Sequence, residues 1–524
     1  MQKKIIIGTR GSELALWQAS FVQQQLEEAG VTSEIKIIKT KGDNIQDLSF
    51  DKMEGKGFFT KEIEDALLSK ETDLAVHSHK DLPTTPTPGL VIAAVSGRED
   101  PAELLLMLPE AMDGKKKFSL KNKAVVGTSS ARRKSQLLAH RPDVVLKELR
   151  GNVPTRIRKL REKEYDAILI ASAGVERLNP DLSGLHTERL DPKEFIPAPA
   201  QGVLAIQARA DDKELLSTLD KINNKNVSEV ISIERKVMNL FDGGCQLPLG
   251  VYCERNEDES GEDVFMVWSA RAETWNALPK HIYVQSKRSE GLAEKIFKKL
   301  TTANPCSVFI TRNTNQHDFF TRILSGAGYT VNGQALIEMN TIPIRKMPAA
   351  DWIFFSSKHA VKFFFDQQPE TPGAKYAVVG KATAEVLRRY GKKADFIGYS
   401  TDTSLTGKQF AATAGRSMIL FPQAKGSLRT VQQQFPDQSK VMDMIVYETV
   451  KREITNLPPA EVLVFTSPSN TEAFLEKQSI RPDQKIVAMG HATANTLRKK
   501  GFKAHAMPVT FDDVGLVQAV FGLQ

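Results

Sequence analysis

Short apolar runs alternate with stretches of helical periodicity over the first 220 residues. Residues 5–7, 73–77, 124–126 and 166–171 are largely apolar and have the length of strands. The first and third runs lead into turns rich in glycine, serine or threonine, and helical patterns begin at these turns. Strands that alternate with helices are typical of α/β domains. We therefore predict α/β structure for this part of the chain.

The pattern changes at about residue 223. Residues 227–240 have helical periodicity and end at an Asp-Gly-Gly-Cys sequence. Strand-like segments follow at 264–272 and 281–285, and the acidic segment 256–263 is expected to form the solvated tip of a hairpin. Polar residues and a proline at 301–305 are typical of a domain junction. These features predict a small separate domain.

The last 220 residues contain an internal repeat. Ser357 and Ser467 stand 110 positions apart, and so do Gly380 and Gly490. Each copy reads strand, Ser/Thr turn, helix, strand, Gly-x-Ala-Thr turn, helix. This order predicts a doubly wound α/β unit, in which ligands usually lie at the strand-to-helix turns. We expect two such lobes with a cleft between them.

Composition limits the class of protein. The chain has 524 residues, of which 41% are hydrophobic and 26% charged. These values are ordinary for a soluble globular protein of about three or four folding units. The apolar runs fall well short of the roughly 20 residues of a membrane helix, and the N-terminal run is too brief for a signal peptide. We predict a cytoplasmic protein without membrane contact.

The positive charge is local. The formal net charge is +8, and the segment 132–163 alone holds 11 Lys and Arg against three acids. A local excess of this size predicts an anionic partner. The segment has no Phe, Tyr or Trp to stack on bases, which disfavours nucleic acid. A polycarboxylate or a polyphosphate is the preferred ligand.

Arginines in this segment stand at two predicted helix starts. Arg132 and Arg133 follow Ser130, and Arg150 and Arg156 flank the second start. Helix N-termini attract anions, and a guanidinium group can bind a carboxylate or phosphate through two hydrogen bonds. A solvated face is expected to be formed by Arg158, Lys159, Arg161 and Lys163.

Other residues could carry chemistry. Asp81 follows a predicted strand and Lys80, and beside a basic site it would remain a carboxylate able to stabilise a passing cation. A turn-capping role is the alternative. Cys245 is either a thiol activated by nearby arginines or a buried apolar residue. His77 and His79 have no Cys or Glu nearby to complete a ligand set, so no metal site is predicted.

Eight motifs occur in one order along the first 300 residues. They are TRGSELALWQ (9–18), GKG (55–57), HSHKD (77–81), GTSSARR (127–133), RGNVPTR (150–156), Ala173-Gly174 with Arg177, PAQG (199–202) and GGCQLP (243–248). With these motifs, residues 1 to about 300 closely resemble hydroxymethylbilane synthase, also called porphobilinogen deaminase.

The resemblance implies that four porphobilinogen molecules are joined head to tail with loss of ammonia. Each carries an acetate and a propionate, so the growing chain is a polycarboxylate. Cys245 would hold a dipyrromethane cofactor through a thioether, and Asp81 would stabilise the cationic pyrroles that form as ammonia leaves. The cofactor carboxylates would be held by Lys80, Ser130, Arg132, Arg133 and Arg156. The incoming ring would be held by Arg10, Ser12, Arg150 and Arg177.

Residues 306–524 resemble uroporphyrinogen-III synthase. The internal repeat, the Val-Tyr-Glu-Thr sequence at 446–449 and the Phe-Thr-Ser-Pro-Ser sequence at 465–469 carry this resemblance. It implies that Tyr447 assists loss of the substrate hydroxyl group, and that carboxylates are bound by Thr383, Ser467 and Thr493. For Thr383 and Thr493, capping of their own helices is the alternative.

The whole chain is thus predicted to be a monomeric bifunctional enzyme of tetrapyrrole biosynthesis. It would convert porphobilinogen to hydroxymethylbilane and close this product to uroporphyrinogen III. The alternatives are a two-lobed anion-binding or sensor protein, and a deaminase with an inactive C-terminal scaffold. The expected parts are two lobes like those of periplasmic binding proteins (1–100 with 198–222, and 101–197), a cysteine-bearing domain (223–302) and two C-terminal lobes (306–344 with 450–524, and 345–447).

Overall fold

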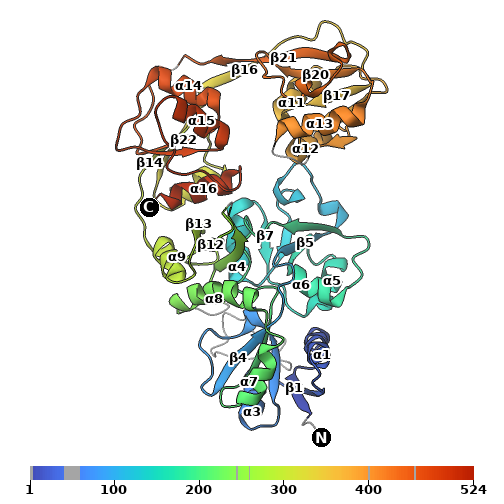
Figure 1. Ribbon diagram of the computed structural model, residues 1–524, viewed down its shortest axis with the longest axis vertical. Coiled ribbons are helices and arrows are strands. Elements are labelled where there is room, and N and C mark those ends of the chain that lie inside the picture. The colour runs from blue at the N-terminus through green and yellow to red at the C-terminus, as the bar shows by residue number, and fades with distance from the viewer. Residues whose placement is uncertain are drawn as a thin grey trace.

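The computed structural model describes residues 4–40, 60–242, 246–258, 260–398, 402–453 and 456–523. These residues form five β-sheets with helices packed against them, three sheets in the N-terminal half and two in the C-terminal half (Figure 1). The predicted α/β fold class is confirmed. Within the described ranges, every helix is too short or too polar to cross a membrane.

The first sheet combines strands from the N-terminus with one returning strand. Its elements are β1 (Ile5–Thr9), α1 (Glu13–Glu28), β2 (Ser33–Ile37), α3 (Lys61–Leu68), β3 (Leu74–Ser78), β4 (Leu90–Val95), β10 (Leu204–Arg209) and α7 (Lys213–Asp220). The strand order is β2-β1-β3-β10-β4, and β10 runs antiparallel to β3 and β4. Ile7, Leu74 and Val22 pack between this sheet and α1.

The second sheet is formed by the segment between the two halves of the first. Its elements are β5 (Glu103–Met107), β6 (Val125–Gly127), α4 (Ala131–His140), β7 (Val145–Lys147), α5 (Val153–Arg161), β8 (Ala167–Ala171), α6 (Ser172–Leu178) and β9 (His186–Leu190). The strand order is β7-β6-β8-β5-β9.

The chain crosses between the first two sheets twice, and the crossing segments touch. Gly202 has a φ of +86°, and a Cβ atom there would lie 2.6 Å from the carbonyl oxygen of Glu99. Glycine is therefore required where the two segments pass each other.

The third sheet is a three-stranded antiparallel meander. Its elements are α8 (Lys225–Leu240), β11 (Leu249–Glu257), β12 (Asp263–Arg271), β13 (Lys280–Ser286) and α9 (Leu292–Thr301). β11 was not predicted, whereas the acidic hairpin tip lies between β11 and β12 as expected. Both helices pack on the sheet through the apolar face that their periodicity predicted.

The two C-terminal sheets reproduce the internal repeat. The first lobe contains β14 (Ser307–Ile310), α10 (Phe319–Gly326), β15 (Thr330–Gly333), β22 (Val462–Phe465), α14 (Pro468–Lys477), β23 (Lys485–Ala488), α15 (His491–Lys499) and α16 (Asp513–Gly522). The second contains β16 (Ile337–Thr341), β17 (Trp352–Phe355), α11 (Lys358–Phe365), β18 (Lys375–Val378), α12 (Lys381–Arg389), β19 (Phe396–Ile397), α13 (Thr403–Ala414), β20 (Ile419–Ala424) and β21 (Val441–Lys451). Phe355 pairs with Val378, and Phe465 pairs with Ala488 in the equivalent register.

Strand pairing differs from the expected division of these lobes at both crossing points, because β16 and residues 450–451 of β21 lie in the six-stranded sheet. β16 pairs antiparallel with β21, from Ile337 with Lys451 to Thr341 with Tyr447. Residues 337–341 thus belong to the six-stranded sheet, whereas the expected first lobe extended to residue 344. Strands β16 and β21 also connect the lobes at the top of Figure 1. This pairing was not predicted, because β16 is short and half-exposed and its partner strand lies more than 100 residues away.

One apolar core joins the two halves of the molecule. Helix α16 packs against β13 and α10, so that Val517 and Phe521 share a core with Ile282 and Ile296. Polar contacts surround this core, since Lys299 donates to the carbonyl oxygen of Gly522 at 3.1 Å. The junction at 302–306 therefore joins two packed bodies.

Buried histidines make this core sensitive to acid. Burial lowers the pKa of His281 to about 4, against about 6.5 in an unfolded chain. Because the folded pKa is the lower one, the unfolded chain binds more protons between these two values. The free energy of unfolding therefore falls as the pH drops from 6.5 to 4, by up to about 1.4 kcal/mol per pH unit for each such group.

We predict that His281→Gln removes the contribution of this one titrating group. The free energy of unfolding should then fall less between pH 7 and pH 4.5 in the variant than in the native chain. Urea unfolding between pH 7 and pH 4.5 measures it in both proteins. The same dependence on pH in the variant and the native chain would contradict the prediction.

Candidate functional site

The N-terminus of α4 presents the two arginines that the sequence singled out. Strand β6 ends at Gly127, and the Thr128 hydroxyl accepts a hydrogen bond from the Ser130 N–H at 3.3 Å. The Ser130 hydroxyl in turn caps α4, accepting from the Arg133 N–H at 3.4 Å. The predicted helix start is confirmed, and Arg132 and Arg133 occupy its first turn.

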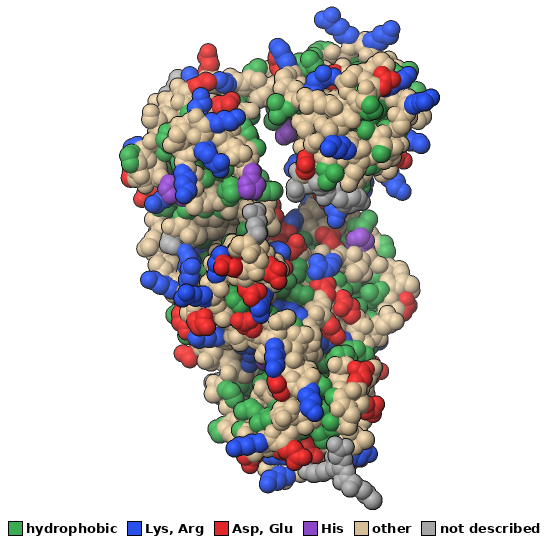
Figure 2. Space-filling model, viewed as in Figure 1, with side chains coloured by type: hydrophobic (Ala, Val, Ile, Leu, Met, Phe, Trp, Pro, Cys, Tyr) green, Lys and Arg blue, Asp and Glu red, His purple; other side chains and the backbone are tan. Residues whose placement is uncertain are grey.

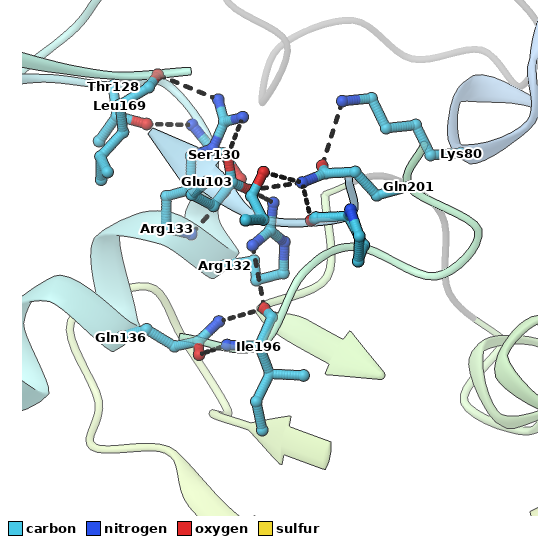
Figure 3. Close-up of polar contacts among 12 residues, drawn as sticks. Lys80, Glu103, Thr128, Ser130, Arg132, Arg133, Gln136, Leu169, Ile196 and Gln201 are labelled. Carbon is cyan, nitrogen blue, oxygen red and sulfur yellow. Dashed lines mark hydrogen bonds and ion pairs between the residues drawn. The ribbon is translucent and has the colours of Figure 1, made fainter. Parts of the chain in front are cut away.

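Glu103 binds both guanidinium groups and is completely buried. Its two carboxylate oxygens lie 2.6 Å from Nη2 of Arg132 and 2.6 Å from Nη2 of Arg133 (Figure 3). Arg132 also donates to the Ile196 carbonyl at 3.0 Å, and Arg133 to the Leu169 carbonyl at 3.3 Å. The two arginines hold the pKa of Glu103 well below its usual range, although burial alone would raise it.

Sequence reasoning missed Glu103, which stands 29 residues before Arg132. The signal that could have found it is a lone carboxylate at the start of an otherwise apolar strand, since a charge is almost never fully buried unless it is paired.

Gln201 extends this network to Lys80. The Gln201 amide donates to Glu103 at 3.2 Å and to the Pro101 carbonyl at 2.8 Å. Its Oε1 accepts from Nζ of Lys80 at 3.2 Å. Burial lowers the pKa of Lys80 to about 8, an effect that the Asp81 carboxylate opposes and Arg133 reinforces. The crossing segment thus connects residues of both sheets.

Asp81 lies at the end of the short 3-10 helix η2 (His79–Asp81), which follows β3, and its side chain is exposed. Its negative charge favours the protonated forms of Lys80, Arg156 and Arg177. Among the described residues, none donates a hydrogen bond to its carboxylate, so the turn-capping alternative finds no support. The structure brings Asp81 and these three cations together.

Arg156 and Arg177 reach the site from different helices. Burial lowers the pKa of Arg156 to about 10, with a contribution from the charge of Arg133, and its Nε donates to the Gly151 carbonyl at 2.7 Å. Nε of Arg177, on α6, lies 2.6 Å from the Glu99 carboxylate.

The other predicted residues stand at helix starts. Ser12 caps α1, accepting from the Ala15 N–H at 3.3 Å, and Arg10 lies just before it. Arg150 precedes α5, whose N-cap is Asn152. Arg158 and its neighbours line the exposed face of α5, as expected.

The cluster carries unbalanced positive charge. Lys80, Arg132, Arg133 and Arg156 provide four cations, against the carboxylates of Glu103 and Asp81. Nε of Arg133 is buried and has no hydrogen-bond partner within the described part of the chain. An anionic ligand with several carboxylates would supply the missing charge and the missing acceptor.

The motifs at 55–57 and 243–245 lie outside the described residues, and so does Cys245. The start of β11, shortly after this cysteine, lies against the arginine cluster. A Cβ atom on Gly250 would lie 2.5 Å from the Ile196 carbonyl oxygen, the same oxygen that accepts from Arg132. The Val251 N–H donates to the Pro197 carbonyl at 3.1 Å.

The predicted C-terminal residues lie in two lobes. Ser467 caps α14, accepting from the Asn470 N–H at 3.2 Å. Gly490 and Gly380 occupy the N-caps of α15 and α12 without a side-chain cap, so the capping alternative for Thr493 and Thr383 is wrong. Both threonines are buried in the first turns of these helices.

Tyr447 lies on β21 in the same lobe as Thr383. Its ring stacks on Phe363 of α11, with ring centres 4.9 Å apart, and its side chain is largely buried. Figure 2 shows an opening between the two C-terminal lobes.

Comparisons with known proteins agree with both resemblances. Residues 5–217 match the family described as porphobilinogen deaminase, dipyromethane cofactor binding domain, and residues 318–518 match uroporphyrinogen-III synthase HemD. The porphobilinogen deaminase of Oceanobacillus iheyensis is 47% identical over 259 residues, covering 49% of this chain and 82% of that protein. The enzyme of Bacillus cereus strain B4264 is 44% identical over 269 residues, covering 51% and 85%.

Solved structures are similar to parts of the chain. Uroporphyrinogen-III synthetase from Helicobacter pylori 26695 is 17% identical with a TM-score of 0.34, covering 42% of this chain and 99% of that one. The periplasmic VFT2 domain of Bordetella pertussis BvgS is 16% identical with a TM-score of 0.27, covering 44% and 92%.

The chain belongs to the porphobilinogen deaminase family and carries a uroporphyrinogen-III synthase domain in its C-terminal half. It is a bifunctional enzyme of tetrapyrrole biosynthesis, with hydroxymethylbilane synthase and uroporphyrinogen-III synthase activities and a dipyrromethane cofactor domain. The predicted family, activities and cofactor are confirmed.

We predict that Glu103→Gln destabilises the N-terminal half by about 3 kcal/mol or more, because two buried guanidinium groups lose their counter-charge. Urea unfolding measures the change. The control is Glu162→Gln, which breaks the exposed pair with Arg158 and should cost about 0.5 kcal/mol or less. Equal effects of the two substitutions would contradict the prediction.

Proposed function

We propose that the cluster around Glu103 is where the deaminase half assembles hydroxymethylbilane. The observation that carries this proposal is the convergence of Lys80, Arg132, Arg133 and Arg156 with the exposed Asp81 carboxylate. The first two sheets both contribute to this convergence, so the site lies where their crossing segments meet.

The cluster fits the cofactor. A dipyrromethane of two rings, each with an acetate and a propionate, bears four carboxylates. The cluster has an excess of positive charge, and Nε–H of Arg133 has no acceptor among the residues that the structure describes. The cofactor supplies the primer to which pyrrole units are added. The residues proposed to bind its carboxylates are Lys80, Ser130, Arg132, Arg133 and Arg156.

Cys245 is the proposed attachment point. It precedes Gly250 by five residues, a span of at most about 18 Å in an extended chain. Because Gly250 packs on the carbonyl that Arg132 binds, a thioether at Cys245 can reach the cluster. The positive charges of the cluster would also favour the thiolate form of a cysteine brought close to it.

Asp81 is the proposed catalytic residue. Positive charge develops on the substrate pyrrole as ammonia leaves, and a fixed carboxylate beside the ring stabilises that charge. The incoming ring also needs partners for its own two carboxylates. For these we propose Arg10, Ser12, Arg150 and Arg177.

The C-terminal half is proposed to bind hydroxymethylbilane between its lobes. Ser467 and Thr493 lie at strand-to-helix turns of one lobe and Thr383 at such a turn of the other, where α/β sheets usually bind ligands. Tyr447 is the proposed group that assists loss of the substrate hydroxyl. Figure 2 shows an opening between the two lobes to which these residues belong.

We propose that the chain works as a monomer, because one chain supplies every residue named for both steps. We also propose that it acts in the cytoplasm. Hydroxymethylbilane closes to the wrong isomer when left free. A second site in the same molecule raises the effective concentration at which the intermediate meets the synthase.

We predict that Asp81→Asn keeps the covalent pyrrole adduct but lowers kcat for hydroxymethylbilane formation by about 10²-fold or more, because the charge is lost and the shape is kept. Intact-mass measurement follows the adduct, and ammonia release follows turnover. Cys245→Ser is the companion variant and should lack the adduct. Native turnover in Asp81→Asn would remove this residue from the mechanism.

For the second activity, we predict that Tyr447→Phe slows formation of isomer III from added hydroxymethylbilane by about 10²-fold, as expected for loss of a proton donor. The isomer ratio, measured by chromatography, should shift toward the spontaneous product. Tyr376→Phe is a matched control, because this buried tyrosine of the same lobe directs its hydroxyl to the Thr371 hydroxyl at 2.6 Å. A native isomer ratio in Tyr447→Phe would refute the assignment.

A further inference from the structure

Helix α10 of the synthase half caps a helix of the deaminase half. Arg322 donates from Nη1 to the Ala139 carbonyl at 2.8 Å and from Nη2 to the Leu138 carbonyl at 3.3 Å. Both carbonyls belong to the last turn of α4, where a helix leaves its C=O groups without internal partners. A positive charge at this end also interacts favourably with the helix dipole.

Three rings surround this cap. Phe319, one turn before Arg322, stacks on His140 with ring centres 4.4 Å apart and meets His281 edge-on at 5.6 Å. His140 is the last residue of α4, whereas His281 lies on β13 of the third domain. Helix α10 therefore fixes the end of α4 relative to that domain.

The other end of α4 carries Arg132 and Arg133. The helix has ten residues and is about 15 Å long. A helix this short is rigid, so a tilt of the helix at the His140 end changes the position of the two guanidinium groups. Glu103 holds these groups from one side, and Arg322 holds the helix from the opposite end.

We infer that Arg322 is a positioning residue for the deaminase reaction, supplied by the synthase half. This inference rests on the proposed function, in which Arg132 and Arg133 hold the carboxylates of the bound pyrrole chain. Fusion of the two enzymes thus serves the first activity through a direct contact.

The test is made on the full chain with Arg322→Ala. We expect kcat for hydroxymethylbilane formation to fall by about threefold to tenfold, the equivalent of one or two hydrogen bonds. The KM for porphobilinogen should stay within about twofold, because other residues hold the incoming ring. Intact-mass spectra during turnover should show partly elongated chains accumulating on the protein, since the bound chain is held less well.

Two controls separate positioning from folding. Arg322→Lys keeps the positive charge and one donor nitrogen, and this variant should recover most of kcat. Arg481→Ala removes an exposed arginine of the same lobe, paired locally with Asp483, and should leave kcat and the mass spectra as in the native chain. Synthase activity of Arg322→Ala, assayed with added hydroxymethylbilane, should also be native.

Two outcomes overturn the inference. One is native kcat in Arg322→Ala. The other is a parallel loss of both activities with a native distribution of bound chain lengths, which indicates general destabilisation. Arg133→Met distinguishes the proposed function from the inference. If Arg133→Met keeps its adduct and full turnover, the proposed role of α4 fails. If Arg133→Met loses turnover while Arg322→Ala keeps native turnover, only the inference about Arg322 is refuted.

Discussion

A buried carboxylate between two guanidinium groups organises the deaminase half. Glu103 comes from β5, and Arg132 and Arg133 come from α4. Burying three charges is costly unless their hydrogen bonds are satisfied, and here each guanidinium group also has a main-chain carbonyl as a partner. Gln201 continues the network to Lys80, so the crossing segment is positioned by the same interaction. The positive charge that remains uncompensated is the feature on which the proposed binding of the acid-bearing substrate chain rests.

The second constraint is the core that the two enzymes share. Residues of α16 and α10 pack with residues of β13 and α9, and the chain needs only a few residues to pass from one half to the other. Such a core fixes the orientation of the synthase lobe next to the third domain. The second C-terminal lobe is attached differently, through β16 and β21, and Figure 1 shows it standing apart from the first. The molecule therefore combines a rigid junction with one lobe that is attached mainly through two strands.

Local patterns in the sequence were sufficient to predict most helices and the repeat. The helices that follow Ser130, Asn152 and Ser467 begin at the turns where helix starts were predicted, because a helix start depends on a few adjacent residues. Contacts between distant segments could not be predicted in this way. Glu103 meets Arg132 only because β5 pairs with β8 beside α4, and β16 joins the six-stranded sheet through a partner more than 100 residues away. The contact of Arg322 with α4 depends on how two families pack together, which neither family pattern contains.

The common core also bears on the evolution of this chain. Val517, Val520 and Phe521 would face water if a gene were divided at the junction between the two enzymes, and so would Ile282 and Ile296 on the other product. Newly exposed apolar faces of this kind promote self-association. Each separated product would need polar replacements on its new surface before it could remain in solution. Gene fission at this point is thus opposed by the same packing that orients the two enzymes.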